Sequence, residues 1–291
     1  MGKYVKSPMN YTGGKYKLLP QILPLFPKDV NTFFDLFTGG ANVAVNVDAK
    51  TVIANDIEKN IIGIYNMFQQ HDINGLIESI EEIIKDYELS ITNADGFNNL
   101  RKLYNSVKLG NCETSYDLHV LLFVLICYSF NHQFRFNSKG EFNMPFGKNR
   151  SQWNNSLKNN LINFHKSITE KNIRFIANDS NDFLNNGCVG KDDFVYCDPP
   201  YLITCATYNE QNGWNEQKEC ELLSLLDRLN SNGIRFALSN VLYSKGKENS
   251  ILKEWSSKYN VYHLDYTYQN CNYHTKDKNN KADEVLVTNY L

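Results

Sequence analysis

The sequence predicts an α/β fold in which a central sheet is interrupted by a long helical insertion, and three observations support this. A β-turn-α-β pattern covers residues 32–56. Strand-like segments are then absent from residues 57–130, where apolar residues recur at helical spacing. Alternating strand and helix patterns return from Ile173 onward. Such alternation is typical of a parallel sheet covered by helices.

The first pattern begins with an apolar strand at residues 32–37, which runs into a turn at Gly39. An apolar-periodic helix is predicted from Ala41 to Val47, and a second strand at residues 51–54 ends before Asp56. In dinucleotide-binding folds an acid at this place binds ribose hydroxyls. The turn lacks the full GxGxxG spacing, which favours a ligand without phosphates. A simple tight turn and a helix N-cap are the structural alternatives.

The insertion is predicted to be helical up to residue 130, with a hairpin turn at residues 137–140 and a helix at 151–168. The remaining predicted elements are strands at 173–177, 193–197, 234–239, 261–268 and 284–290 and a helix at 216–229.

Composition describes an ordinary globular protein, with 42% apolar residues and a net charge of −2. Its seven cysteines include no CxxC pair, which indicates reduced thiols and no metal site. The apolar run Val120–Cys127 is far shorter than the roughly 18 residues of a membrane span, and the N-terminus does not resemble a signal peptide. We therefore expect a cytoplasmic protein. Residues 134–171 carry a local balance of +5, which indicates either a solvated surface or a nucleic-acid contact.

The segment Asp198-Pro199-Pro200-Tyr201 follows the apolar strand at 193–197, and two prolines prevent that strand from continuing. Asp198 is therefore expected at the carboxyl edge of the sheet, where ligands bind in α/β folds. The Asp198 carboxylate and the Pro199 carbonyl can each accept a hydrogen from an amino group on a planar base, and Tyr201 can stack on that base. A plain turn does not require this combination.

The segment Asn10-Tyr11-Thr12-Gly13-Gly14-Lys15 is explained most simply as an exposed loop before a helix. Alternatively, Lys15 pairs with a ligand carboxylate while Tyr11 packs beside the ligand. A ligand with an amino-acid tail like that of methionine would suit this loop.

Four motifs occur in the order NYTGGKYKLLP, FFDLFTGG, FRFNSKGEFNMPFGK and DPPY. Together they resemble the Dam-like (D12 class) adenine-specific DNA methyltransferases over nearly the whole chain. The resemblance implies a Rossmann-like S-adenosylmethionine-dependent methyltransferase fold with a seven-stranded mixed sheet, whose last two strands form an antiparallel hairpin. It implies a catalytic domain of residues 1–56 and 171–291 and a target-recognition domain, helical with a β-hairpin, of residues 57–170.

The implied reaction moves a methyl group from S-adenosylmethionine to the exocyclic amino group of a flipped adenine in duplex DNA. The implied catalytic residues are Asp198, Pro199, Pro200 and Tyr201. The implied cofactor residues are Tyr11, Gly13, Lys15, Asp35, Phe37, Gly39, Asp56, Asp179, Ser180 and Asp198. The implied DNA contacts are Asn10, Phe130, Asn131, Gln133, Arg135, Asn137, Lys139, Pro145, Lys148 and Arg150.

Within the implied DNA contacts, Arg135 would pair with a guanine and Pro145 would touch a thymine methyl. The chain departs from the best-known bacterial member at Gln133, where that protein has an apolar residue, and at Asn10, where it has a lysine. GATC is the expected target.

Two other functions remain compatible with the residues. The same socket could hold the 4-amino group of cytosine, or the chain could bind DNA or S-adenosylmethionine as a regulator without catalysis. The expected partner is double-stranded DNA, in a bacterial or phage-encoded protein that associates with the nucleoid. A restriction endonuclease would be a functional but not a physical partner, and the chain is expected to be a monomer or weak dimer.

Overall fold

The computed structural model describes residues 4–180, 189–204, 213–265 and 282–291. The chain forms two compact units. The helical unit consists of residues 1–14, 39–45 and 58–171, and the sheet unit of residues 15–38, 46–57 and 172–291. Most of the predicted insertion lies in the helical unit, but two segments expected in the catalytic part, 1–14 and 39–45, group with it. The assignment of DNA recognition to residues 57–170 stays a prediction.

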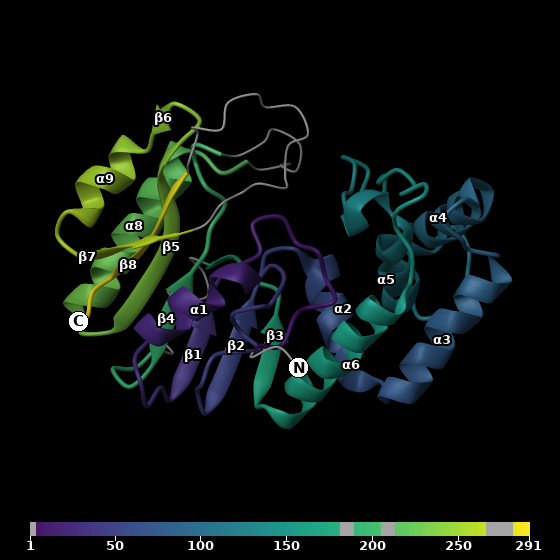
Figure 1. Ribbon diagram of the computed structural model, residues 1–291, viewed down its shortest axis with the longest axis horizontal. Coiled ribbons are helices and arrows are strands. Elements are labelled where there is room, and N and C mark those ends of the chain that lie inside the picture. The colour runs from purple at the N-terminus through teal and green to yellow at the C-terminus, as the bar shows by residue number, and fades with distance from the viewer. Residues whose placement is uncertain (1–3, 181–188, 205–212, 266–281) are drawn as a thin grey trace. The chain divides into compact units, whose positions relative to one another are not determined.

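The sheet unit contains a mixed sheet, which confirms the predicted α/β class (Figure 1). Its strands lie in the order β3 (Ile173–Ile176), β2 (Thr51–Asn55), β1 (Thr32–Asp35), β4 (Phe194–Cys197), β5 (Arg235–Ser244), β8 (Asp283–Thr288) and β7 (Asn260–Leu264). The first five are parallel, and β8 is antiparallel to both β5 and β7, as predicted for the last two segments. A two-residue strand, β6 (Lys247–Glu248), also pairs with β5.

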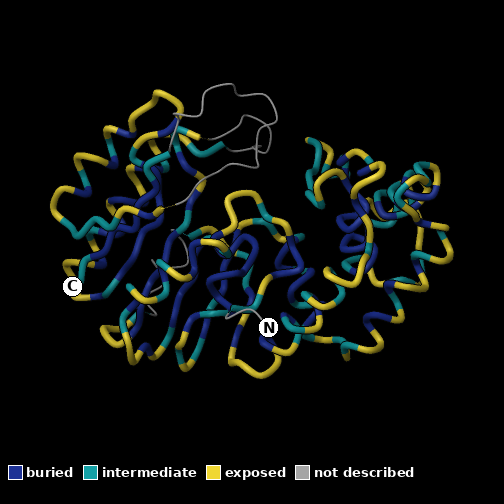
Figure 2. Tube along the Cα trace, viewed as in Figure 1, coloured by how far each residue is buried: buried dark blue, intermediate teal, exposed yellow. Residues whose placement is uncertain are grey.

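Helices α8 (Glu216–Ser231) and α9 (Ser250–Ser256) cover one face of the sheet (Figure 1). Leucines of α8 pack there with Val195 and Phe236. On the other face, the Phe26 ring contacts Phe194 with 4.8 Å between ring centroids. All four residues of β4 are buried, as expected for a strand covered on both faces (Figure 2).

Phe26 lies in the N-terminal segment that precedes β1. This segment contains the short helices η1 (Tyr16–Leu18), α1 (Leu19–Ile22) and η2 (Leu23–Leu25). Its Phe26 ring also contacts Phe33 and Tyr196. Because side chains alternate between the faces of a strand, Asp35 lies on the same face as Phe33. The segment from residue 15 to 26 therefore covers the face toward which Asp35 points.

The helical unit is built around α5 (Leu118–Tyr128), in which every residue from Val120 to Tyr128 is buried. A helix that is apolar on all sides is stable only when other helices surround it. The surrounding helices are α2 (Lys59–Gln70), α3 (Ile73–Asp86), α4 (Ala94–Lys108) and α6 (Asn155–Glu170). Asp72, Asn93, Asp117 and Asn154 cap the N-termini of α3, α4, α5 and α6 through their side-chain oxygens.

Two predicted elements differ from the structure. The helix expected from Ala41 to Val47 is wrong, because these residues form turns. Gly39 and Ala41 both have positive φ, +45° and +54°, and a right-handed helix cannot start from such a backbone. The hairpin turn expected at residues 137–140 is present, but the strands beside it are reduced to an isolated bridge between Phe136 and Phe142.

Among the described helices, none is both long and apolar enough to cross a lipid bilayer.

Candidate active site

Strand β4 ends at Cys197, directly before Asp198, and its neighbours β1 and β5 run parallel to it. The two prolines that follow have no backbone N–H, so the hydrogen bonding between β4 and its neighbouring strands ends there. A turn follows, closed by a hydrogen bond of 2.9 Å from the Thr204 amide to the Tyr201 carbonyl. Asp198 therefore lies at the carboxyl edge of the sheet, as the sequence predicted.

Lys15 is the direct partner of Asp198. Its Nζ lies 2.8 Å from Asp198 Oδ1 and 3.5 Å from Glu284 Oε1, and the side chain is only 3% exposed. The sequence led us to expect a ligand carboxylate as the partner of Lys15, whereas the structure provides two protein carboxylates. Burial lowers the pKa of Lys15, but the charges of Asp198 and Glu284 outweigh burial and raise that pKa overall. Lys15 is therefore a stable cation beside Asp198.

Tyr201 joins the same two carboxylates. Its hydroxyl lies 3.1 Å from Asp198 Oδ1 and 2.9 Å from Glu284 Oε1, so its single proton is donated to one of them at a time. The described contacts of the Asp198 side chain, from Lys15 and Tyr201, are thus both made by Oδ1. This arrangement fixes the carboxylate through one oxygen and leaves Oδ2 for another donor.

The pKa of Asp198 is raised above its ordinary value. Burial is the main cause, the charge and hydrogen bond of Lys15 act against it, and the charge of Glu284 adds to it. A carboxylate with a raised pKa is a stronger proton acceptor than one exposed to water. The site therefore combines a fixed orientation with increased basicity.

Asp35, at the end of β1, is buried, and only one of its oxygens is satisfied within the described chain. Oδ2 accepts a hydrogen bond from the Thr38 hydroxyl at 3.2 Å, while Oδ1 has no partner there. Burial, followed by the charge of Asp198, raises the pKa of Asp35 well above its ordinary value. A buried oxygen without a donor is costly, and the amino group of a ligand would satisfy it.

Asn55 connects the ends of three strands, and the sequence did not identify it. Its Nδ2 donates to the carbonyls of Leu36 and Asn178, both at 3.1 Å, and its Oδ1 accepts from the Asn178 amide. The next residue along the chain, Asp56, is buried at 6% exposure. Asn55 thus holds the backbone beside Asp56 and beside the predicted cofactor residues that follow Leu36 and Asn178.

The predicted residues Phe37, Asp179 and Ser180 lie on the segments that Asn55 holds. The Phe37 ring contacts Trp214 edge-on, with 5.7 Å between centroids. Trp214 in turn donates to Glu219 at 2.5 Å. Asp179 and Ser180 directly follow Asn178 after the end of β3. Trp214 was not predicted, because no local pattern marks it.

Glu284 was also missed, although the sequence contained a signal. It lies in β8, whose following residues are Val285, Leu286 and Val287, and it is 1% exposed. A glutamate is almost never fully buried unless it is paired. An acid directly before the apolar run Val285–Val287 was therefore a reason to expect a buried cation, here Lys15.

In the helical unit, the structure brings together two further predicted residues, Tyr11 and Gly39. A Cβ at Gly39 would lie 2.9 Å from Tyr11 Cδ1, so only glycine allows the ring to pack there. Gly13 has φ +80° in the turn closed by the bond from the Gly14 amide to the Tyr11 carbonyl. The Tyr11 ring also contacts Phe134, at 5.8 Å between centroids.

The predicted DNA-contact residues Asn10, Asn131 and Arg150 form one cluster. Asn10 Nδ2 donates to the Asn131 carbonyl at 2.7 Å, and Arg150 Nη1 donates to Asn131 Oδ1 at 3.3 Å. The Arg150 guanidinium lies 4.8 Å from the ring centroid of Phe130, which is 39% exposed. Asn131 and His132 both have positive φ, so this short segment, η3 (Phe130–His132), is held in an uncommon conformation.

Arg135 is held along one edge by Asn143. Its Nε donates to Asn143 Oδ1 at 2.8 Å and its Nη2 to the Asn143 carbonyl at 3.2 Å. Asn137 has a structural task, because its Oδ1 accepts from the Lys139 and Glu141 amides and shapes the turn. The remaining predicted contacts, Gln133, Pro145 and Lys148, lie on the half-buried or exposed surface of the same unit.

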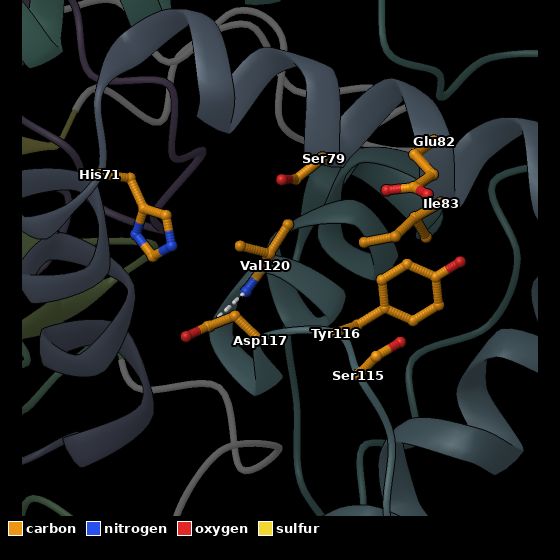
Figure 3. Close-up of a pocket in the computed structure, with 8 residues that line it drawn as sticks. All are labelled: His71, Ser79, Glu82, Ile83, Ser115, Tyr116, Asp117 and Val120. Carbon is orange, nitrogen blue, oxygen red and sulfur yellow. Dashed lines mark hydrogen bonds between the residues drawn. The ribbon is translucent and has the colours of Figure 1, made fainter.

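A separate polar pocket of about 430 Å³ lies between α3 and the start of α5, and none of the predicted site residues lines it. Its lining consists of His71, Ser79, Glu82, Ile83, Ser115, Tyr116, Asp117 and Val120 (Figure 3). The Asp117 side chain there accepts from the Val120 amide at 3.1 Å, so that carboxylate caps α5. The sequence and structure assign no chemistry to this pocket.

Comparison with known proteins supports the resemblance seen in the motifs. Type II methyltransferase M.FokI of Planomicrobium okeanokoites is 46% identical over 99% of this chain. Modification methylase StsI of Streptococcus sanguinis is 47% identical over 99% of this chain. Each match covers 43% of the relative, so the chain spans less than half the length of either protein. DNA adenine methylase of Salmonella typhi is 26% identical over 85% of this chain and 82% of its own length.

Among solved structures, the rRNA methyltransferase aviRa of Streptomyces viridochromogenes aligns with 94% of this chain and 81% of its own, at 11% identity and a TM-score of 0.35. The model of the D12 class N6 adenine-specific DNA methyltransferases matches residues 11–270. Given this match and the two relatives near 46% identity, the chain belongs to the D12 class of N6 adenine-specific DNA methyltransferases.

Proposed function

We propose that this chain transfers a methyl group from S-adenosylmethionine to the exocyclic amino group of adenine in duplex DNA. The observation that carries the proposal is the geometry of Asp198, which Lys15 and Tyr201 fix through Oδ1 at the carboxyl edge of the sheet. The orientation and raised pKa of this carboxylate suit the acceptance of a hydrogen from a weakly nucleophilic amino group.

The residues present fit the cofactor. The unsatisfied Oδ1 of Asp35 suits an amino group, and the glycine turn without a phosphate-binding pattern suits a nucleoside with an amino-acid tail. When bound, S-adenosylmethionine supplies an electrophilic methyl group on a sulfonium. The residues proposed to hold it are Tyr11, Gly13, Lys15, Asp35, Phe37, Gly39, Asp56, Asp179, Ser180 and Asp198.

The protein's task is to make the adenine amino group a better nucleophile, since its lone pair is delocalised into the ring. Asp198 Oδ2 and the Pro199 carbonyl each accept one amino hydrogen, which stabilises the positive charge that grows on this nitrogen. Tyr201, whose hydroxyl is anchored, presents its ring beside the base. A base in a duplex must be flipped out to reach these groups, at a cost of a few kcal/mol.

Recognition of the DNA is assigned to residues 57–170 together with Asn10. The support is the local charge of +5 at residues 134–171, the exposed Phe130 and the oriented Arg135. GATC is the proposed target sequence. If the chain recognises a different sequence, Asn10 and Gln133 are the residues expected to account for the difference.

The proposal is tested by incubating the purified chain with duplex DNA and S-adenosylmethionine carrying a radiolabelled methyl group. Nucleoside analysis should show N6-methyladenine. N4-methylcytosine would instead establish the cytosine reaction, and no transfer to any DNA would favour a binding protein without activity. Single-molecule sequencing of DNA from a methylation-deficient host that expresses the chain would identify the target site.

Arg135→Ala is expected to reduce discrimination at one guanine by about 1–3 kcal/mol, because Asn143 occupies one edge of the guanidinium and leaves the other for a base. Asn143→Ala should cause part of the same loss, since it frees the side chain of Arg135. The measurement is binding to duplexes that differ by one base pair. Lys139→Ala, on the exposed turn, is the control and should weaken all sequences alike. If Arg135→Ala also weakened all sequences alike, Arg135 would be a phosphate contact.

Asp35→Asn is expected to stabilise the free protein while weakening cofactor binding. Because the pKa of Asp35 is raised well above its ordinary value, the folded state binds the carboxyl proton more tightly than the unfolded chain does, and stability falls as pH rises above that ordinary value. The substitution removes this cost at pH 8, where Tm should rise by about 2–4 °C for each kcal/mol recovered. The gain should disappear near pH 4, and the rise of Tm on adding S-adenosylmethionine should be lost.

The control for this prediction is Asp193→Asn, at another buried aspartate. The Asp193 carboxylate accepts from Asn31 Nδ2, the Thr32 amide and the Gly190 amide at 2.7–3.2 Å. An amide cannot accept all three bonds, so Tm should fall. A fall of Tm in Asp35→Asn at pH 8 would contradict the prediction.

A further inference from the structure

Glu284 lies beside the catalytic segment because of the sheet topology. Strand β8 is antiparallel to β5, so its first residues lie beside the carboxyl-terminal half of β5, where Glu284 pairs with Val241. Since Val285 and Val287 pack in the core under α8 and α9, alternation directs Glu284 to the opposite face. Asp35 and the Phe26 ring lie on that face. A buried glutamate from the last strand is thereby placed beside groups at the ends of β1 and β4.

Glu284 and Asp198 share two donors. Its Oε1 lies 2.9 Å from the Tyr201 hydroxyl and 3.5 Å from Lys15 Nζ, and these are the two groups that also bond to Asp198 Oδ1. We propose that Glu284 is a positioning residue for methyl transfer: by drawing Lys15 and Tyr201 partly to itself, it keeps Asp198 a strong acceptor. This inference rests on the proposed role of Asp198.

The physical argument is a competition between two carboxylates for two donors. Tyr201 has one proton and Lys15 one charge, and both are shared between Asp198 and Glu284. Without Glu284, both donors would act more strongly on Asp198, and its remaining oxygen would become a weaker acceptor. Two carboxylates around one ammonium leave an excess of one negative charge in a buried place, which keeps the basicity of Asp198 high.

The electrostatics of the site agree with this competition. Burial is the largest cause of the raised pKa of Asp198, and of the two charged neighbours Lys15 lowers it whereas Glu284 raises it. The titratable groups that face Asp198 are Lys15 before η1, Asp35 at the end of β1, Tyr196 and Cys197 on β4, Tyr201 in the turn and Glu284 on β8. Glu284 is the one of these whose removal is expected both to lower the basicity of Asp198 and to leave the fold intact.

The test uses Glu284→Gln, a nearly isosteric change whose amide oxygen can still accept from Tyr201. The rate of methyl transfer in a single turnover should fall by about 10- to 100-fold, by analogy with the loss on removing a residue that orients a metal ligand. The acidic limb of the pH–rate profile should move to lower pH, because Asp198 loses the neighbour that raises its pKa. Glu284→Asp, which keeps the charge, should retain the acidic limb of the unaltered protein.

The matched control is Asp283→Asn, the same chemical change one residue earlier in β8. Asp283 is 39% exposed, lies on the other face and pairs with His263 at 2.7 Å. Rate and pH profile should be unchanged in this variant. Equal losses in Asp283→Asn and Glu284→Gln, or an unmoved acidic limb in Glu284→Gln, would overturn the proposal.

A second readout does not depend on activity. The carboxyl carbon of Asp198, labelled with ¹³C and assigned with Asp198→Asn, can be titrated by NMR without DNA or cofactor. Its midpoint should lie at lower pH in Glu284→Gln than in the unaltered chain, and an unmoved midpoint would overturn the proposal. If the unaltered chain failed to methylate DNA, the proposed function would be wrong, while this titration would still decide whether Glu284 tunes Asp198.

Discussion

Asp198→Ala is expected to lower the rate of methyl transfer to duplex DNA by about 10²- to 10³-fold, by analogy with the removal of one preorganised transition-state contact. The loss should appear in kcat, because the acceptor matters most when charge develops on the amino nitrogen. Binding of S-adenosylmethionine, measured by calorimetry, should fall much less than the rate, since Asp198 is one of ten residues proposed to hold the cofactor and the others, Asp35 and Asp56 among them, are unchanged.

The fold of Asp198→Ala is expected to persist, because Lys15 keeps Glu284 as a partner at 3.5 Å. The Tm therefore serves as a check that activity is lost for a chemical reason. Asp48→Ala, at an exposed aspartate of the sheet unit, is the control and should methylate DNA normally. Undiminished activity in Asp198→Ala would contradict the role of this residue and, with it, the central step of the proposed mechanism.

Lys15→Met is expected to destabilise the fold by about 3–5 kcal/mol at neutral pH, the cost of leaving buried charges without their partner. The Asp198 and Glu284 carboxylates would then lie together with no cation between them. Urea unfolding measures this loss. The slope m of the unfolding free energy against urea concentration is fixed at the value of the unaltered chain.

The pH dependence of Lys15→Met follows from the direction of the pKa shifts. The raised pKa of Lys15 means that its contribution is complete below the ordinary pKa of lysine and is lost only as pH rises through the higher folded value. Lys15 lowers the pKa of Asp198, so its removal raises that pKa further. The deficit of the variant should therefore shrink as pH is lowered, because Asp198 takes up a proton more readily without Lys15.

The control for Lys15→Met is Lys253→Met, which breaks an ion pair of similar length on the surface. Lys253 Nζ lies 2.6 Å from Glu248 Oε1, but the two side chains are 63% and 49% exposed. Such a pair contributes about 0–1 kcal/mol, so the variant should unfold almost like the unaltered chain. If both variants lost a similar free energy of unfolding, the buried ion pairs of Lys15 would stabilise the fold no more than a surface ion pair does.

Local patterns predicted those parts of the molecule that depend on neighbouring residues. The apolar run before Asp198 predicted β4, and the two prolines predicted where it ends. Apolar residues at helical spacing predicted the helices of the insertion, including α3 and α5. The pattern failed at Ala41–Val47, where the apolar spacing suited a helix but positive φ at Gly39 and Ala41 prevented one. The sign of the backbone angle φ is set by packing, for example by the contact of the Tyr11 ring with Gly39. It cannot be inferred from the spacing of apolar residues.

The sequence by itself determined the α/β class, the place of Asp198 at a strand end and, through four motifs in one order, the family. Only the tertiary structure decided which groups surround Asp198. Lys15 and Glu284 are separated by almost the whole chain and meet because β8 returns antiparallel beside β5. From the sequence alone, a cation in an N-terminal loop and an acid in the last strand could each pair with many other residues. Burial selects one arrangement, since charges removed from water are stable only where they are paired.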